Sequence, residues 1–232
     1  MYTRDIKQWI SSLKDGSIIL AKTAYENYFS DMKEATFYQL LARLNEEKYI
    51  GKIAKGLYFK PYKRQVDNLP EPSKLLDFFT SKYKHGMLIG GKMLLAKGII
   101  KEDNNPYYNV ITNTIEIKTK RYISNLVIET VDIDYRNSKV RESIEMLEMI
   151  EIIDQYDNYD KNKLDEFIEA FAKNYNEATF NKVLNAKTYK KRNIAAVKLV
   201  LDYYNVANNL SKQLNTASKY QLPGHFLKYI EQ

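Results

Sequence analysis

The first 64 residues constrain the fold most strongly, because short segments with different hydrophobic periods follow one another there. Helical spacing of apolar residues alternates with short apolar runs that are typical of strands. The expected elements, in chain order, are a helix on Ile6, Ile10 and Leu13, a strand at Ser17–Leu20, a helix at 22–29, a third helix on Phe37–Leu44, and strands at Tyr49–Ile53 and Leu57–Lys60. Gly56 can adopt the positive φ that a turn between the last two strands needs. Asp31 and Glu34 resemble a capping box that would begin the third helix.

A short segment with two prolines, Asn68–Ser73, follows this first unit. Prolines at this density between periodic segments are typical of a linker. We therefore expect two domains, one over 1–66 and a larger one over 73–232.

The second domain is predicted to be mixed. A helix is expected over 73–84, and strands between about 108 and 133, with a hairpin that turns at Asn113–Thr114. After about residue 138 the pattern predicts helices, including a long one over 192–214. The predicted fold class is α+β.

The composition excludes several kinds of site. The chain has no Cys, which excludes disulfides, Cys-ligated metals and thiol catalysis. Its two histidines, His85 and His225, are too few for a multi-His metal site. No segment reaches the roughly 18 apolar residues of a membrane span, and the N-terminus carries no signal-peptide pattern. We expect a cytoplasmic protein without cofactor, metal or catalytic residues and without a membrane partner, while the net charge of +7 favours an anionic partner.

The third predicted helix has an apolar face and a polar face. The apolar stripe consists of Phe37, Leu40, Leu41 and Leu44. The opposite face carries Ala35, Thr36, Gln39, Ala42 and Arg43. Gln39 can form a bidentate contact with adenine, and Arg43 can contact guanine or a phosphate. Tyr38, at the margin, can donate to a phosphate. Together with the order of the elements, this face predicts a winged helix-turn-helix that binds DNA with this helix.

The predicted hairpin concentrates positive charge. Residues 48–64 contain no acidic residue and six basic ones, which are Lys48, Lys52, Lys55, Lys60, Lys63 and Arg64. Residues 1–47 have a net charge of −1. We therefore expect Lys52, Lys55 and Lys60 to contact phosphates, beside Thr36, Gln39 and Arg43 as candidate base contacts.

Three stretches resemble the N-terminal domain of AbiEi-type antitoxins. They are Gly16–Leu20, Leu40–Leu44 and Tyr49–Tyr58, the last with the Lys-Gly-Leu-Tyr ending of that family's wing. The run Tyr108–Arg121 is similar, more loosely, to the hairpin of the family's second domain. The resemblance covers about 1–64 well and about 73–153 loosely, and it ends near residue 155.

The resemblance implies a bacterial antitoxin of an abortive-infection toxin–antitoxin operon. In such an operon the winged helix binds inverted repeats in the promoter and represses transcription. The second domain is needed to counter a nucleotidyltransferase-like toxin. Direct contact between antitoxin and toxin does not follow from the residues.

Other constellations favour structural roles. Asp132 and Asp134 lie on a predicted strand and would share a face, as metal-binding carboxylates of nucleotidyltransferases do, but Gly90–Gly91 lies too far upstream to serve as the loop of such an enzyme. Acidic residues recur every third position in Glu142, Glu145, Glu148, Glu151, Asp154, Asp157 and Asp160, which predicts a solvated helix surface. A smaller basic cluster, Lys118, Lys120 and Arg121 beside Tyr122, is interpreted as a solvated strand end.

Two alternatives stay open beside the antitoxin. One is a winged-helix transcription factor unrelated to a toxin, whose second domain senses a ligand. The other is a metal-dependent nucleotidyltransferase that uses Asp132 and Asp134.

Overall fold

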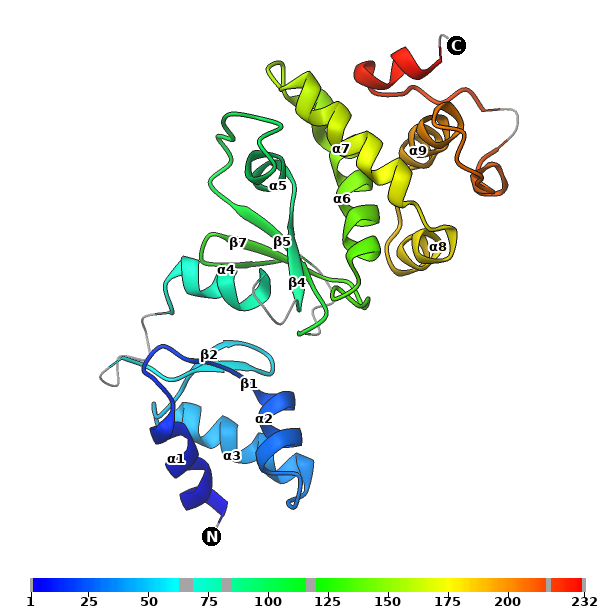
Figure 1. Cartoon of the computed structure of the whole chain (residues 1–232). Helices are drawn as coiled ribbons and strands as arrows, with labels where there is room; N and C mark the ends of the chain where they lie inside the picture. The colour runs from blue at the N-terminus through cyan, green and yellow to red at the C-terminus, as the bar shows by residue number, and fades with distance from the viewer. Residues whose placement is uncertain (1, 63–68, 81–84, 116–119, 216–217, 231–232) are drawn as a thin grey trace.

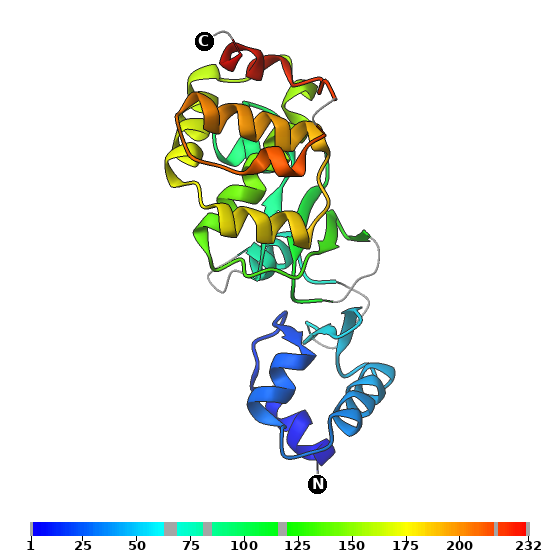
Figure 2. The same ribbon diagram turned by 90° about the vertical axis from the view of Figure 1, so that its right-hand side faces the viewer.

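Helices and two small sheets form two units along the chain, which is the expected α+β class (Figure 1). The computed structural model describes residues 2–62, 69–80, 85–115, 120–215 and 218–230. Figure 2 shows the N-terminal unit at one end of the molecule, with its hairpin nearest the C-terminal unit.

The N-terminal unit packs three helices against a three-stranded antiparallel sheet. Its elements are α1 (Tyr2–Ser12), β1 (Ile18–Leu20), α2 (Ala21–Tyr28), α3 (Glu34–Glu46), β2 (Gly51–Ala54) and β3 (Leu57–Phe59). The strand order is β1-β3-β2, so the first strand adds to the hairpin. This is the topology of a winged helix, as the sequence predicted. Gly56, with a φ of 76°, makes the β2–β3 turn.

Helix α3 begins later than a capping box at Asp31 predicts, so that prediction is wrong. Lys33 occupies the N-cap position, and no side chain caps the helix there. The Met32 amide donates to the carbonyl of Phe29, in a turn that buries Met32 in the core. Burial of Met32 therefore sets the start of the helix at Glu34, and Asp31 is left exposed.

The three-stranded sheet is apolar on both faces. Ile19 and Tyr58 face the helices and share a core with Phe37. Leu57 and Phe59, on the other face, belong to a second core. Because both faces of β3 are buried, this central strand is a continuous apolar run, whereas the outer strand β2 exposes Lys52.

This second core joins the two units. Leu57 and Phe59 pack there with Leu75 and Phe79 of α4 (Pro72–Thr80) and with Leu126 of the C-terminal sheet. In Figure 1, α4 and this sheet lie on the side of the hairpin that faces away from α1 to α3. The proline-containing segment thus connects two units that bury apolar surface against each other. Residues 81–84 of the helix expected over 73–84 lie outside the described residues.

The C-terminal unit begins with a four-stranded mixed sheet. Its elements are β4 (Gly86–Ile89), α5 (Gly91–Ala96), β5 (Tyr108–Thr112), β6 (Arg121–Ile123) and β7 (Leu126–Thr130). The strand order is β4-β5-β7-β6, with β5 and β7 parallel and the other pairs antiparallel.

The hairpin predicted at Asn113–Thr114 is wrong. Strand β5 pairs with β4 on one edge and with β7 on the other, so neither edge is left for the segment that follows it. The Asn113 amide instead donates to the carbonyl of His85 at 3.1 Å. Beyond Ile115, the expected strand to residue 119 lies outside the described residues. The observed hairpin is β6–β7, which turns at Ser124 with a φ of 54°.

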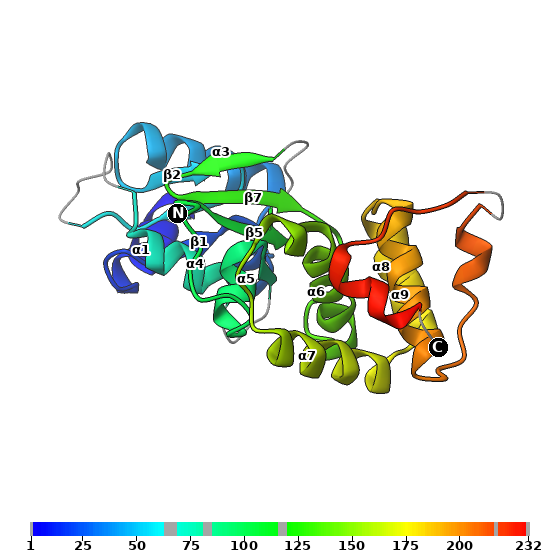
Figure 3. The ribbon, with the colours of Figure 1, turned by 90° about the horizontal axis from the view of Figure 1, so that it is seen from above.

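Helices complete the C-terminal unit, as the sequence predicted. They are α6 (Ser138–Ile152), η1 (Ile153–Gln155), α7 (Lys161–Asn174), α8 (Glu177–Ala186), α9 (Lys191–Tyr203), η2 (Leu210–Gln213) and η3 (Gly224–Tyr229). Figure 3 places α6 between the sheet and the pair α8 and α9. Among the described helices, none combines the length and the apolar character that crossing a bilayer requires.

The helix predicted over 192–214 is shorter, because the chain leaves α9 at Tyr203. Asn205 takes a φ of 55°, and the Val206 amide donates back to the carbonyl of Leu201 at 2.8 Å. Asn tolerates this left-handed conformation better than most residues, so it ends the helix.

The acidic residues of α6 do not form the solvated surface that their spacing predicted. Glu145 pairs with Lys97 at 2.8 Å, and the buried Glu148 pairs with Lys187 at 2.8 Å. Neighbouring elements cover α6 on several sides, and a buried carboxylate is tolerated there only with a cationic partner. These partners come from the residues that follow α5 and α8.

Candidate nucleic-acid interface

The outer face of α3 is open and polar. Of the predicted apolar stripe, Phe37, Leu41 and Leu44 are fully buried beneath it, and Leu40 is half-buried. Gln39 is exposed one turn before the exposed Arg43, and Thr36 is half-buried. Exposed Ala35 and Ala42 flank them. Small residues around Gln39 allow a close approach to a groove of DNA.

Arg43 is exposed but already bound within the unit. Its Nη2 donates to Thr3 Oγ1 at 2.8 Å, and its Nε lies 3.5 Å from Glu47 Oε1. Lys7 donates to the other carboxylate oxygen of Glu47, and this hydrogen bond is the main reason why the pKa of Glu47 is lowered. Arg43 therefore lies over α1, and a contact with a base requires that it leave these partners.

Lys52 and Lys55 of the hairpin carry ammonium groups without a described carboxylate partner. Lys52 projects from β2 and Lys55 from the β2–β3 turn, and both are exposed. Neither forms an ion pair with a carboxylate in the described part of the chain. Such unpaired ammonium groups on a hairpin are available to phosphates.

Lys60, which the sequence predicts to contact a phosphate, is bound within the fold. Its Nζ donates to the carbonyl oxygens of Ser11 and Leu13 at 3.0 and 2.6 Å, and it pairs with Asp15 at 3.2 Å. The carbonyls at the end of α1 have no partners within the helix, and a cation there also favours the helix dipole. Lys60 thus caps the C-terminal end of α1. Lys63 and Arg64 lie outside the described residues.

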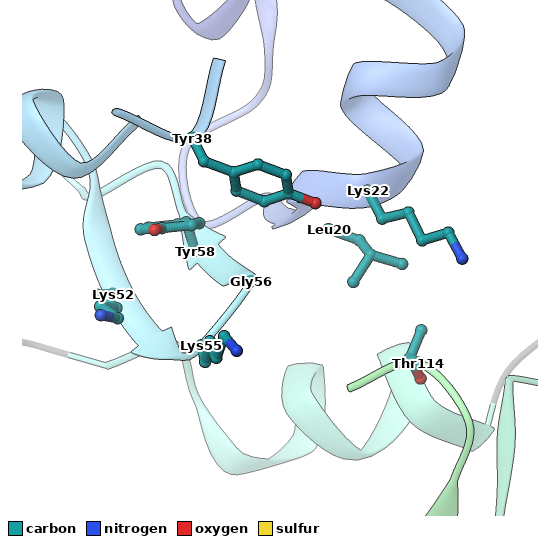
Figure 4. Close-up of a pocket in the computed structure, with 8 residues that line it drawn as sticks. All are labelled: Leu20, Lys22, Tyr38, Lys52, Lys55, Gly56, Tyr58 and Thr114. Atoms are coloured by element: carbon teal, nitrogen blue, oxygen red, sulfur yellow. The ribbon is translucent and has the colours of Figure 1, made fainter. Parts of the chain in front are cut away.

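A hollow of about 360 Å³ lies beside the hairpin. Tyr38 from α3 and Tyr58 from β3 line it, and Lys22, Lys52 and Lys55 stand around it (Figure 4). The pocket is completed by Leu20, Gly56 and Thr114. No described carboxylate lines it. Burial raises the pKa of the Tyr58 phenol, so this group stays protonated and can donate a hydrogen bond.

Lys22 and Thr114 were missed by the sequence reasoning. Lys22 lies in the first turn of α2, and Thr114 comes from the segment after β5. No local pattern marks either residue, because only the packing of the C-terminal unit on the sheet brings Thr114 next to the hairpin.

Asp132 and Asp134, the carboxylate pair considered for a metal site, do not share a strand face. Strand β7 ends at Thr130, so Asp132 and Asp134 lie beyond it instead of on one strand face, and both are exposed. The predicted strand to Ile133 is therefore too long. Asp134 Oδ1 accepts the amide of Arg136 at 3.0 Å. Among the described residues, no three His, Cys, Asp or Glu are grouped to hold a metal ion.

His225 and the second basic cluster are also accounted for. The His225 ring lies between Asp165 and Tyr159, with its Nε2 2.7 Å from Asp165 Oδ1. Lys120 lies 3.6 Å from Glu129, and Arg121 is exposed on the edge strand β6. Lys118 lies outside the described residues.

Comparison with known proteins assigns this chain to no family. No protein-family model matches the chain, and no curated protein matches it either. The fold and the α3 face define a winged helix joined through its sheet to a mixed α+β unit.

Proposed function

We propose that this chain binds duplex DNA through α3 and the β2–β3 hairpin. The observation that supports it best is the pairing of an exposed hydrogen-bonding face on α3 with the unpaired Lys52 and Lys55 beside it. Gln39 offers a bidentate contact to a base, whereas the two lysines offer contacts to the backbone. Thr36 and Tyr38 flank this contact, and Arg43 joins it by exchanging Glu47 for a phosphate or guanine.

The proposed biological role is that of a DNA-binding antitoxin and autorepressor in the cytoplasm of a bacterium. It rests on the resemblance of Gly16–Leu20, Leu40–Leu44 and Tyr49–Tyr58 to AbiEi-type antitoxins. In this role the winged helix binds inverted repeats in its own promoter, and the C-terminal unit counters a nucleotidyltransferase-like toxin. The proposal assigns the chain no catalytic reaction.

A band-shift titration of the full chain with its own promoter DNA tests the first step. The Lys52→Gln/Lys55→Gln double variant should bind more weakly, and its affinity should depend less steeply on salt. The matched control is Lys182→Gln/Lys212→Gln, which removes the same charge from exposed positions of the C-terminal unit. Equal losses in both variants, or no retardation of promoter DNA by the wild type at low salt, would contradict the proposal.

Co-expression with the product of the neighbouring gene tests the second step. The full chain should rescue cells from that toxin, and the Lys52→Gln/Lys55→Gln variant should rescue equally well from an unrelated promoter although it no longer represses. Loss of rescue in this folded variant would contradict the division of roles. If no neighbouring gene product is toxic, the antitoxin role fails while the DNA-binding proposal stands on its own titration.

A further inference from the structure

The hollow between α3, the hairpin and the C-terminal unit has an unusual electrostatic lining. Lys22, Lys52 and Lys55 stand around it, and none forms an ion pair with a described carboxylate. Two other lysines of this unit are paired, Lys7 with Glu47 and Lys60 with Asp15. Three like charges around one concavity repel one another, and an anion in it relieves this repulsion.

Its wall also offers aromatic and hydrogen-bonding surface. The rings of Tyr38 and Tyr58 line the side of the hollow next to α3 and β3 (Figure 4). Aromatic side chains of this kind stack on nucleobases. A volume of about 360 Å³ lies in the range of pockets that hold small organic ligands.

The opposite wall comes from a different part of the chain. Thr114, after β5, closes the hollow across from the hairpin. Its amide donates to Thr112 Oγ1 at 3.1 Å, and this Thr112 hydroxyl also donates to the carbonyl of His85 at 2.7 Å. The hollow is thus bounded by both units, which a flat contact with a DNA backbone does not require.

We propose that this hollow binds a free nucleotide, with the base against Tyr38 and the phosphates between the lysines, and that the nucleotide competes with DNA. Competition follows because Lys52 and Lys55 belong both to the hollow and to the proposed DNA contact. The competition between nucleotide and DNA rests on the proposed function, whereas nucleotide binding itself does not.

Isothermal titration calorimetry on the full chain tests the binding, with ATP, adenosine and tripolyphosphate as the three probes. ATP should bind at least about tenfold more tightly than either fragment, because it uses both the lysines and the tyrosine rings. Tripolyphosphate binding as tightly as ATP would overturn the nucleotide assignment in favour of a simple anion site. No heat of binding with ATP would overturn the site altogether.

Variants locate the ligand in the hollow. Lys22→Gln, which leaves the proposed DNA contacts intact, and Tyr38→Leu should each weaken ATP binding by about tenfold. Tyr38→Phe keeps the ring and should retain most of the affinity, and Lys182→Gln is the charge-matched control on α8. Unchanged ATP binding in Lys22→Gln and Tyr38→Leu would place the ligand elsewhere and overturn the proposal.

Displacement of a labelled promoter duplex by ATP tests the competition. ATP should release the duplex from the wild type at concentrations that saturate the hollow, and Lys22→Gln should need about tenfold more ATP. A duplex that stays bound in the presence of saturating ATP would overturn the competition. If the wild type binds no duplex, the proposed function fails, and the calorimetric titration still decides whether the hollow binds nucleotides.

Discussion

The ammonium group of Lys60 donates a hydrogen bond to the carbonyl oxygen of Leu13 at 2.6 Å. This contact links the residue after β3 to the end of α1, so the hairpin and the first helix stabilise each other. It also shows why a basic residue in a hairpin is not by itself a DNA contact. The ammonium groups of Lys52 and Lys55 have no carboxylate partner among the described residues, whereas that of Lys60 pairs with Asp15.

Replacement of Lys60 by Met should lower the free energy of unfolding by about 1–3 kcal/mol, because the carbonyls of Ser11 and Leu13 lose their donor. Urea denaturation followed by the fluorescence of Trp9, the single tryptophan, measures this. The control is Lys55→Met, an exposed position where a change within about 0.5 kcal/mol is expected. Equal stabilities of the two variants would contradict the role of Lys60.

Gln39 and Lys55 should differ in how they affect DNA binding. Gln39→Ala should reduce discrimination at one base pair by about 1–3 kcal/mol and leave the salt dependence unchanged. Lys55→Gln should weaken binding to all sequences alike and lower the salt slope by about one. Competition titrations with single-base operator variants at several salt concentrations separate the two effects. Equal, sequence-independent losses in both variants would show that α3 does not read bases.

The two units should unfold together, because Leu57 and Phe59 share a core with Leu75 and Phe79. Trp9 fluorescence reports on the N-terminal unit, and far-ultraviolet circular dichroism is dominated by the larger C-terminal unit. Their urea transitions should coincide in the wild type. Phe59→Ala should lower both midpoints, at a cost of about 3–5 kcal/mol. Two separate transitions in the wild type would mean that the shared core contributes little.

Stability should fall as the pH is lowered through about 6.5, the ordinary pKa of histidine. Burial lowers the pKa of His225, and it also lowers that of His85. The unfolded chain then takes up these protons first, so acid favours unfolding until the pH falls below the folded pKa values. His225→Gln should reduce the pH slope between about pH 7 and 5.5 to roughly half, because His85 still contributes.

Denaturant titrations at several pH values measure this slope. The expected ceiling for one group is about 1.4 kcal/mol per pH unit. A slope in His225→Gln as steep as in the wild type would show that His225 is not a source of the dependence.

The winged helix could be predicted in detail because its elements are defined locally. The stripe of Phe37, Leu41 and Leu44 sets which face of α3 is buried, and Gly56 permits the turn of the hairpin. Element order then leaves few ways to pack three helices and a hairpin. For the same reason the exposure of Gln39 followed directly from its position on α3.

The sequence-based predictions were wrong where a strand or a charged side chain pairs with residues far along the chain. The turn at Asn113–Thr114 has the local signal of a hairpin, yet β5 is already paired on both edges. The spacing of Glu145 and Glu148 indicates a solvated face, yet Lys97 pairs with the half-buried Glu145 and Lys187 with the buried Glu148. Helix and strand periods carry no information about such distant partners.

The sequence by itself determined the element types and order of the winged helix and the charge of the hairpin, since these depend on spacing and composition within a few turns of chain. Only the tertiary structure decided which lysines are free. Lys60 is used at the end of α1, whereas Lys52 and Lys55 stand with Lys22 around a hollow that Thr114 closes. The physical reason is that an ammonium group pairs with whichever carbonyl or carboxylate the fold brings within hydrogen-bond distance, and packing of the two units sets those distances.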